Sequence, residues 1–569
     1  MADTVEWHRA ASPDAAGELA NAGFETWVAK LLARRGIEDA ASAEAFLNPT
    51  LDQLHDPQQL AGMDEAVARL LTARDTGDEV ALIGDYDVDG VTGSAILVAV
   101  LRACGLSVHP IIPHRMTEGY GFQPVHVERA VALGAKLMIT VDCGVSSHSA
   151  AAASLDAGME VIVTDHHLPK EPLPDEVIQI NPHQPTCTYP FTELSGAGLA
   201  LKLALAMAKA CERDINPRLL LRVACLGTIA DLVPLRGENR VIASVGLYEL
   251  SRTRSPGLKA LIDVAGLRPP FSAADVGYRI GPRINAPGRL DSAEGALELL
   301  LCRDPEHARK LATELDQWNR DRQLEQRRVV DEAREALVTE GAALPPILVG
   351  WSEDWHRGVV GVAAGRLAKE LNRPTILLAV DGDQATGSGR SIPGIHLHDF
   401  LKRWDGDMSR FGGHAQAIGM TVETAALPIL QQRWEEAAET WREKVAVKRY
   451  EYELELAPAE INRRLSQQLD AFEPFGQANP QPLIYVPGPL QLVRSPRFFG
   501  QGHLSAQAMD RNGGRIALLG WGWEDRAAEL LGEFEVLGYL EKDRYRGTVL
   551  RLVDCRSAAA AERDEERTA

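Results

Sequence analysis

The sequence predicts a multi-domain α/β protein. It has a domain built on a parallel sheet, a second α/β domain joined to it by a long helix, and a small antiparallel barrel or sandwich at the C-terminus. Three observations predict this class. Near-continuous apolar runs alternate with helical stretches from about residue 79, a densely charged stretch with helical apolar spacing covers 304–340, and short alternating runs follow residue 450. A chain of 569 residues also exceeds what one hydrophobic core supports.

The first α/β unit contains five apolar runs typical of buried strands, with a helix predicted over 94–101 after the first of them. The runs lie at 79–84, 108–112, 136–142, 159–164 and 177–181. Buried strands that alternate with helices indicate a parallel sheet covered on both faces. Ligands of such sheets gather at the carboxyl ends of the strands. The remainder, to about residue 300, is mostly helical, with a loop predicted around 279–289 where Gly and Pro are frequent.

The second unit follows a boundary near Pro345-Pro346, with strands at 347–349 and 374–378 and a helix beginning near Val359. Composition and pattern divide the chain into six parts. They are an N-terminal segment (1–75), the first α/β domain (76–300), the connecting helix (301–343), the second α/β domain (344–448), the C-terminal β domain (449–556) and a disordered tail (557–569).

Bulk composition excludes several classes of protein. No apolar run is long enough to span a membrane, and the N-terminus lacks a basic segment followed by an apolar one, so we expect a cytoplasmic protein with no membrane partner. The seven cysteines form no Cys-x-x-Cys pair, which disfavours structural zinc and a disulfide framework. A net charge of −20 argues against coating nucleic acid by bulk charge. Any such contact must use local basic clusters or metal ions.

Acidic residues end apolar runs repeatedly in the first unit, and two histidines accompany them. Because a buried carboxylate costs free energy unless a partner or cation neutralises it, their recurrence predicts a metal site. For any single one of these acidic residues, the alternative to metal binding is that it caps a helix. If their segment is extended, Asp85, Asp87 and Asp89 would point the same way. Carboxylates and imidazoles in this number suit two divalent cations. The set is Asp85, Asp87, Asp89, Asp142, Asp165, His166, His167 and Asp231.

These residues stand in motifs that resemble, in order, those of the DHH phosphoesterase superfamily. The motifs are 84–90, Asp142-Cys143-Gly144, Asp165-His166-His167 and Asp231. The second unit resembles the substrate-binding domain associated with that superfamily, and the segments at 115–121, 285–289 and 473–476 resemble its branch of bacterial single-stranded-DNA exonucleases. The resemblance implies that the C-terminal domain is an oligonucleotide-binding (OB-like) barrel.

The resemblance also assigns roles. It implies that Asp85 and Asp87 bind one cation, Mn²⁺ or Mg²⁺, that Asp89, His166 and Asp231 bind the other, and that Asp142 bridges the two. Asp165 and His167 then support the ligands or face the phosphate, with His167 a candidate proton donor. Hard carboxylates with one or two imidazoles suit these cations better than structural zinc.

Substrate contacts are predicted in three places. Arg115, Tyr120 and Phe122 are candidates to bind a strand by charge and stacking, as are basic and aromatic residues of the C-terminal domain. Backbone N–H groups around Gly387, with a hydroxyl and a guanidinium, are predicted to bind a terminal phosphate. The other candidates are Arg283, Asn285, Arg289, Ser388, Gly389, Arg390, Gly412, Gly413 and His414, and in the C-terminal domain Arg494, Arg497, Phe498, Phe499, Arg511 and Arg515.

The resemblance implies an exonuclease that degrades single-stranded DNA from its 5′ end to 5′-mononucleotides, in repair and recombination, with a single-strand-binding protein and a helicase as partners. Two alternatives stay open. One is a phosphodiesterase of the same fold that acts on short oligoribonucleotides or cyclic dinucleotides, which needs no long track for a strand. The other is a non-catalytic nucleic-acid-binding subunit, which should have lost some of the carboxylates.

Overall fold

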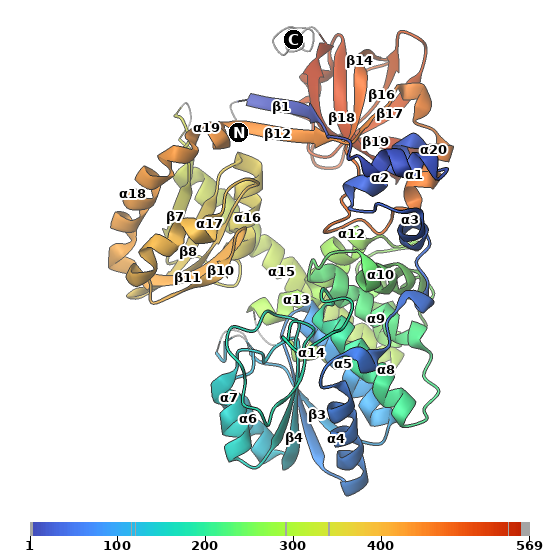
Figure 1. Ribbon diagram of the computed structural model, residues 1–569. Helices are drawn as coiled ribbons and strands as arrows, with labels where there is room; N and C mark the ends of the chain where they lie inside the picture. Colours follow the sequence, from blue (N-terminus) through green and yellow to red (C-terminus); the bar gives the residue numbers. More distant parts are fainter. Residues whose placement is uncertain are drawn as a thin grey trace.

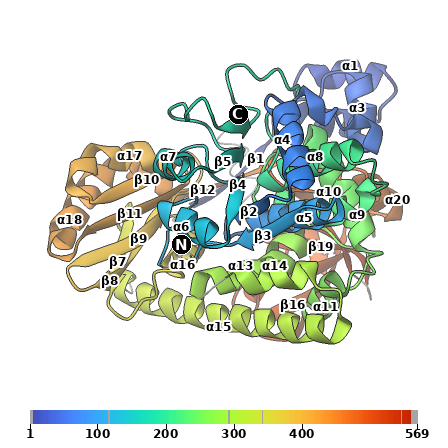
Figure 2. The same cartoon turned by 90° about the horizontal axis from the view of Figure 1, so that it is seen from below.

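The computed structural model describes residues 4–114, 117–119, 121–290, 293–339, 342–543 and 546–558. The first α/β unit, the second α/β unit and the C-terminal β unit lie as three bodies around the long helix α15 (Pro305–Leu337) and its neighbours (Figure 1). Seen from below, α15 runs along one side of the molecule and joins the two α/β units (Figure 2). Within the described residues, no helix combines the length and apolar character needed to span a bilayer.

The N-terminal segment divides between two cores. Helices α1 to α3 pack on the C-terminal β unit, with Leu31 and Phe46 in one core with Phe472 and Phe534. Helix α4 packs on the first α/β unit instead. The elements are β1 (Thr4–Arg9), α1 (Ala15–Asn21), α2 (Thr26–Arg34), α3 (Ala40–Leu47), 3₁₀ turns at Leu51–Gln53 and Pro57–Gln59, and α4 (Met63–Thr76).

The first unit has the predicted parallel sheet of five strands, in the order β3-β2-β4-β5-β6. Helices α5, α8 and α9 share the core on one face, and α6 and α7 share the core on the other. The elements are β2 (Glu79–Gly84), α5 (Val88–Ala103), β3 (Ser107–Ile111), α6 (Pro124–Ala132), β4 (Ala135–Val141), α7 (His148–Asp156), β5 (Glu160–Thr164) and β6 (Ile178–Ile180).

A helical layer follows the sheet. The loop predicted around 279–289 is wrong, because this segment is a π-helical turn followed by a helix with Pro287 inside it. Pro282 stands in the first turn, where its missing N–H is tolerated. The elements are α8 (Gly196–Ala210), α9 (Pro217–Ala230), α10 (Gly237–Leu250), α11 (Pro256–Val264), α12 (Ala273–Asp275), the π turn (Val276–Ile280), α13 (Gly281–Leu290), α14 (Glu294–Leu301) and α15 (Pro305–Leu337).

The second unit is a mixed five-stranded sheet in the order β10-β11-β9-β8-β7. Helices α15 and α16 share the core on one face, and α17 and α18 share the core on the other. The elements are β7 (Leu348–Ser352), α16 (Val360–Leu371), β8 (Thr375–Asp381), β9 (Gln384–Arg390), α17 (Leu397–Leu401), β10 (Arg410–His414), β11 (Ala417–Glu423), α18 (Leu427–Ala438) and α19 (Arg442–Ala446).

The C-terminal unit is a seven-stranded sheet in which β14 pairs with β18 and also with β16. Strand β12 leads into it and pairs with β1 in parallel. The elements are β12 (Val447–Tyr452), β13 (Leu454–Glu455), α20 (Arg463–Asp470), β14 (Ile484–Leu492), β15 (Arg497–Phe499), β16 (His503–Asp510), β17 (Arg515–Gly520), β18 (Phe534–Asp543) and β19 (Gly547–Ser557). The tail predicted to be disordered lies, beyond residue 558, outside the described residues.

Candidate metal centre and substrate surface

The predicted acidic residues meet at the carboxyl edge of the parallel sheet. Asp85 follows β2, Asp142 follows β4 and Asp165 follows β5, and these three strands are neighbours in the sheet. Asp231 reaches the same place from the C-terminal end of α9. The topology of the sheet therefore explains why residues almost 150 positions apart in sequence lie together.

Asp142 has the most constrained environment of the set. Its φ of 62° is left-handed, a conformation that costs free energy for a residue other than Gly. Its backbone N–H donates to the Thr164 carbonyl oxygen at 2.9 Å, which fixes the turn. A Cβ at Gly196 would lie 2.5 Å from the Asp142 Cβ, so only glycine lets α8 begin this close to the carboxylate.

Asp89 is held by the start of α8. Its carboxylate accepts hydrogen bonds from the backbone N–H groups of Gly196 at 2.6 Å and Ala197 at 3.0 Å. A helix N-terminus favours a carboxylate there. Burial nevertheless dominates, and with the nearby Asp87 charge it raises the pKa of Asp89 to about 7.

The first motif is not extended, so the condition under which alternation would align its three carboxylates is not met. Asp87 is the N-cap of α5, where it accepts from the N–H groups of Asp89 at 2.9 Å and Gly90 at 3.1 Å. Asp89 lies in the first turn of that helix. Asp87 thus has the capping role of the alternative interpretation, yet the helical turn still brings it to the cluster.

The ligand atoms converge in three overlapping groups, each within 4.8 Å, and the last two are those predicted for separate cations. The groups are Asp142, His166 and His167; Asp89, His166 and Asp231; and Asp85, Asp87 and Asp142.

Two orphaned atoms support a metal site. Asp142 Oδ1 and His166 Nε2 lie 3.1 Å apart, and both are buried without a hydrogen-bond partner in the described part of the chain. Burial lowers the pKa of His166 to about 4, so its ring is neutral and available as a ligand at neutral pH. Carboxylates crowded with a neutral imidazole fit Mn²⁺ or Mg²⁺.

The carboxylates repel one another. Burial first, and then the neighbouring aspartates, hold the pKa of Asp142 well above its usual range and raise that of Asp231 to about 9. A site that raises the pKa of its own ligands binds cations strongly, because the positive charge removes the repulsion and replaces the protons.

His167, a member of the first ligand group, also pairs with Asp165. Asp165 Oδ1 lies 2.7 Å from His167 Nδ1, and its Oδ2 accepts the Val145 N–H at 2.9 Å. Burial opposes protonation of His167, but the hydrogen bond and charge of Asp165 raise its pKa to about 9. Both Asp165 oxygens are engaged within the chain, so Asp165 positions His167.

The first group of substrate residues is only partly in place. Arg115 and Tyr120 lie outside the described residues. The prediction that Phe122 stacks a base is wrong, because its ring is buried in the core beneath α6 and α7. Arg283 binds Asp316 of α15 at 2.8 Å and the Arg279 carbonyl oxygen, which ties α13 to the connecting helix. It is not a free cation for a phosphate.

The predicted backbone anion site in the second unit is also wrong. Strand β9 lies between β8 and β11 and pairs with both along its whole length, so its N–H groups are used in the sheet. Gly389 instead lets Ile418 and Leu397 pack against the strand, since a Cβ there would lie 2.8 Å from Ile418.

The side chains of this strand do gather where an anion could bind. Ser388 and Arg390 face α16, and a Cβ at Gly361 would lie 3.1 and 3.2 Å from their Oγ and Nη2 atoms. Arg289 reaches the same end of α16 from the first unit, with its Nη1 atom 3.4 Å from the Gly358 carbonyl oxygen. We call Arg289, Ser388 and Arg390 the α16 cluster.

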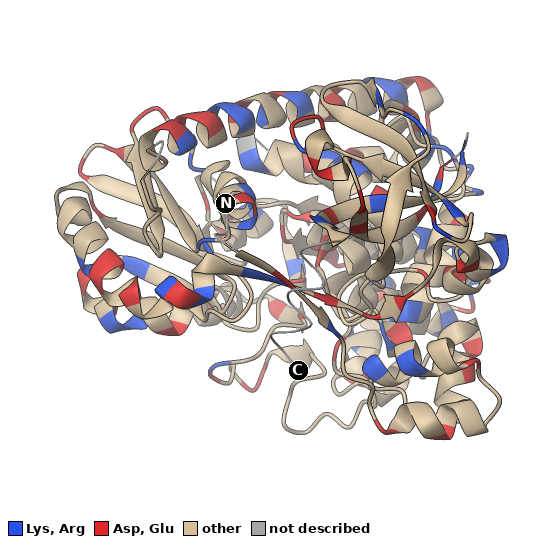
Figure 3. Cartoon of the chain, turned by 90° about the horizontal axis from the view of Figure 1, so that it is seen from above, with Lys and Arg blue, Asp and Glu red and all other residues tan. Residues whose placement is uncertain are grey.

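The other candidates lie on exposed strands. Gly412, Gly413 and His414 are on the edge strand β10, with His414 exposed. Phe498 is 51% exposed on β15, whereas Phe499 packs against His503 and Trp521. Arg511 pairs with Glu533 at 3.1 Å, and Arg494, Arg497 and Arg515 are exposed. Lys and Arg interleave with Asp and Glu over the chain rather than forming one basic block (Figure 3).

Three family models match consecutive parts of the chain. They are the N-terminal domain of the DHH family over residues 79–228, the DHHA1 domain over 344–445 and the RecJ OB domain over 452–552. The single-stranded-DNA-specific exonucleases RecJ of Escherichia coli and Salmonella typhimurium are each 37% identical over 509 residues, which cover 86% of this chain and 87% of theirs. The chain belongs to the RecJ family.

Other relatives agree. The Bacillus subtilis exonuclease RecJ is 38% identical over 81% of this chain, which spans only 58% of that longer protein. The crystal structure of Thermus thermophilus RecJ in complex with Mn²⁺ has a TM-score of 0.81 and 31% identity, covering 98% of this chain and 80% of its own, and its Mg²⁺ complex has a TM-score of 0.75. Both cations are those that the acidic cluster here fits.

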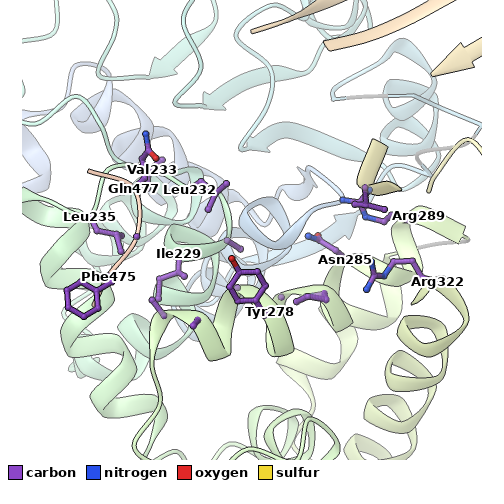
Figure 4. A pocket seen from close by; sticks show the side chains of 18 residues that line it. Ile229, Leu232, Val233, Leu235, Tyr278, Asn285, Arg289, Arg322, Phe475 and Gln477 are labelled. Carbon is purple, nitrogen blue, oxygen red and sulfur yellow. The ribbon is translucent and has the colours of Figure 1, made fainter. Parts of the chain in front are cut away.

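The structure also reveals a cavity that the sequence did not predict. It lies beside Asp231 and is lined by Leu232, Tyr278 and Phe475 at one end and by Asn285 and Arg322 near the other (Figure 4). In sequence, Arg322 is one of many charges on the connecting helix, and nothing local distinguishes it from a solvated residue. The exposed Leu232 directly after a metal-ligand candidate is the one signal that sequence reasoning overlooked.

Proposed function

We propose that this protein is a single-stranded-DNA-specific exonuclease that hydrolyses phosphodiester bonds from the 5′ end and releases 5′-mononucleotides. The observation that carries the proposal is the convergence of six carboxylates and imidazoles in two ligand groups joined through one edge of the sheet, with Asp142 and His166 atoms left orphaned by the protein. The RecJ relatives support single-stranded DNA as the substrate.

Different side chains of the cluster would bind the two cations. Asp85 and Asp87 would hold one cation, Asp89, His166 and Asp231 would hold the other, and Asp142 lies between the groups. Two bound divalent cations supply Lewis acidity to the scissile phosphate and to an attacking water. The short hydrogen bonds from α8 to Asp89 and the fixed turn at Asp142 hold the ligands before substrate arrives, which reduces reorganisation during the reaction.

His167 is the proposed proton donor to the leaving 3′ oxygen. Although burial opposes it, the hydrogen bond and charge of Asp165 raise the pKa of His167 to about 9 in the metal-free protein, and Asp165 fixes the ring through Nδ1. The Nε2 atom is then the one that can face substrate, and the side chain is partly exposed. A positioned acid of this kind contributes roughly 10²–10⁴-fold to the rate.

The α16 cluster is the proposed site for the 5′-terminal phosphate. Two guanidinium groups and a hydroxyl meet at the N-terminal end of a twelve-residue helix, where backbone N–H groups and the helix dipole favour an anion. Because Arg289 comes from the first unit and the other two residues from the second, a phosphate bound here orients the strand across the metal centre. This arrangement supports 5′ to 3′ polarity.

A cellular role in DNA repair and recombination, with a single-strand-binding protein or helicase that supplies substrate, is part of the proposal on the strength of the relatives' naming. The same-fold alternative, a phosphodiesterase for short oligoribonucleotides or cyclic dinucleotides, has no observation in its favour here, since the OB-domain match and the connecting helix suit a longer strand.

One assay separates the candidates. The protein is incubated with Mn²⁺ and 3′-labelled single strands, with and without a 5′ phosphate, beside duplex DNA, a diribonucleotide and a cyclic dinucleotide. We expect mononucleotides from single-stranded DNA, faster with the 5′ phosphate. Cleavage confined to dinucleotides would establish the alternative, and no cleavage of any substrate would indicate a binding subunit. Arg390→Gln should reduce the preference for the phosphorylated end, while Arg366→Gln on the exposed side of α16 should not.

A further inference from the structure

Two cysteines stand at the far ends of the two helices that begin at the metal centre. Helices α5 and α8 pack against each other on one face of the first sheet and share its core. At their N-terminal ends, backbone N–H groups of α8 hold Asp89 of α5. At the opposite ends, Cys104 is the C-cap of α5 and Cys211 is the C-cap of α8. A helix of 16 residues is about 24 Å long, so the pair lies far from the acidic edge.

Both helices end in the same kind of turn. In each, the residue after the cysteine is left-handed, Gly105 with a φ of 94° and Glu212 with a φ of 50°. The following N–H then donates back into the last helical turn, at 3.0 Å from Leu106 and at 2.9 Å from Arg213. Glu212 takes this conformation at a cost in free energy that a glycine would not have. The backbone of each cysteine is therefore fixed by the turn that follows it.

The two thiols lie together. The Cys104 thiol donates to the Met207 carbonyl oxygen at 3.8 Å, and the Cys211 N–H donates to the same oxygen at 2.9 Å. Burial first, and then a hydrogen bond with the Cys211 thiol, raise the pKa of Cys104 to about 12. Both cysteines are free thiols in this structure. Thiols in contact at two fixed helix ends can bond to each other through rotation of their side chains.

The surroundings of the two thiols differ. Cys104 is 4% exposed within the core, whereas Cys211 is partly exposed. Arg74 of α4 donates to the Cys211 sulfur at 3.5 Å, and the charge of Arg213 is also close to the pair. Reactive cysteines are typically partly exposed beside basic groups, while cysteines buried in apolar surroundings are inert on their own. Cys211 is therefore the thiol that an oxidant reaches first.

We propose that Cys104 and Cys211 form a reversible disulfide when the protein is exposed to hydrogen peroxide. The Cys211 sulfur attacks one peroxide oxygen, the O–O bond breaks, and Cys211 becomes a sulfenic acid while the other oxygen leaves as water with the thiol proton. The Cys104 sulfur then displaces the hydroxyl group of that sulfenic acid, which leaves as water with the Cys104 proton. In total, two thiols and one peroxide give one disulfide and two waters.

The bond would join the two helices that hold Asp89 and border Asp142. It closes a loop from residue 104 to residue 211, and a cross-link over a long loop stabilises the fold by constraining the unfolded chain. The sulfurs are already in contact, and they lie at the opposite ends of the helices from the metal ligands. Oxidation therefore stabilises the first unit and leaves the geometry of the metal centre unchanged.

Mapping of thiols on the full chain tests the bond directly and needs no nuclease activity. The protein is treated with hydrogen peroxide in EDTA, free thiols are blocked with iodoacetamide, and tryptic peptides are analysed by mass spectrometry without reduction. We expect peptide 103–115 linked to peptide 210–213, and dithiothreitol should separate them. Cys104→Ala should instead accumulate a sulfenic acid at Cys211 that reacts with dimedone. Cys302→Ala, which removes another partly exposed thiol, is the matched control and should still form the link.

Thermal unfolding measures the consequence. Oxidised wild type should have a higher Tm than reduced wild type, and Cys211→Ser should show no difference between the two treatments. After removal of peroxide and addition of Mn²⁺, cleavage of single strands by the oxidised protein should stay within about two-fold of the reduced protein. Cys104 and Cys211 that stay reduced while Cys302 is oxidised, or that bond to other partners, would overturn the inference. A loss of activity that Cys211→Ser escapes would overturn the stabilising role of the bond.

Discussion

Two regions of this protein bury charged groups, and they differ in how the free-energy cost of that burial is offset. Arg240 on α10 is 2% exposed and has no acidic partner among the described residues. Each of its nitrogens nevertheless donates to a carbonyl oxygen, at 2.6 Å to Phe46, 3.1 Å to Phe472, and 3.0 Å to both Ala471 and Glu473. Its guanidinium also stacks over the Phe46 ring at 3.6 Å. At the metal centre, carboxylates are buried against one another and orphaned atoms persist.

The difference separates stability from function. Arg240 joins the N-terminal segment, the first unit and the segment before the OB unit, and the chain itself supplies every partner. The acidic edge keeps Asp142 and His166 atoms that no group in the described part of the chain satisfies, so it needs cations from outside. Removing the charge of Arg240 should therefore destabilise the protein. Removing a carboxylate charge from the acidic edge should instead leave the metal-free protein as stable as before or more stable, as is typical of sites where binding is maintained at the expense of stability.

The largest expected effect is on activity, from Asp142→Asn. Losing the charge between the two ligand groups should lower kcat at least about 10³-fold, since it weakens binding of the cations that would stabilise the transition state. The metal-free variant should unfold at the same or a higher temperature than wild type, because one repelling charge is gone. Activity within ten-fold of wild type, or a clear loss of metal-free stability, would contradict the contrast drawn here.

Arg240→Met should have the next largest effect, on stability. It leaves several buried carbonyl oxygens without donors, and breaking a buried charged network costs about 3–5 kcal/mol. Urea unfolding of the metal-free protein measures it, with the exposed Arg327→Met as control. If Arg240→Met unfolds like the control, the contacts of Arg240 do not stabilise the packing of the units on one another.

The two regions also differ in how far sequence could foresee them. The carboxyl ends of parallel strands share one edge, so the apolar runs before Asp85, Asp142 and Asp165 were enough to predict the site. Arg240 depends on carbonyl groups 194 and 232 residues away, which no local pattern encodes.

Errors in the second unit have a related cause. A glycine-rich run suggests backbone free to bind an anion, but pairing on both sides of β9 depends on the order of strands in a mixed sheet, which sequence does not fix. The prediction that Phe122 stacks a base was wrong for the same reason, since its burial results from the packing of α6 and α7 over it. The shared edge of a parallel sheet could be predicted from the strand pattern alone, whereas the strand order of a mixed sheet and the packing of helices over Phe122 could not.

Metal binding should shift stability only through the acidic edge. At a free Mn²⁺ concentration 100 times Kd, one site adds about 2.7 kcal/mol to the free energy of unfolding. Thermal unfolding with and without Mn²⁺ should show this gain in wild type and, from a lower baseline, equally in Arg240→Met. Asp142→Asn should lose most of it. An equal gain in all three proteins would mean that Mn²⁺ binds elsewhere.

The smallest effect is the pH dependence of the metal-free protein between pH 6.5 and 8.5. Asp231, with a pKa of about 9, and His167, also about 9, keep protons in the folded state that the unfolded chain releases, so stability should fall as pH rises. His166 opposes this trend only below pH 6.5, because its pKa is about 4 when folded.

One group contributes at most about 1.4 kcal/mol per pH unit, so the slope is resolved by comparing variants. Asp231→Asn should flatten it, Arg240→Met should leave it unchanged, and saturating Mn²⁺ should remove or reverse it, because the cation replaces the protons. A slope that survives Asp231→Asn undiminished would mean that Asp231 does not hold an extra proton in the folded protein, and the contrast drawn here between Arg240 and Asp231 would then fail.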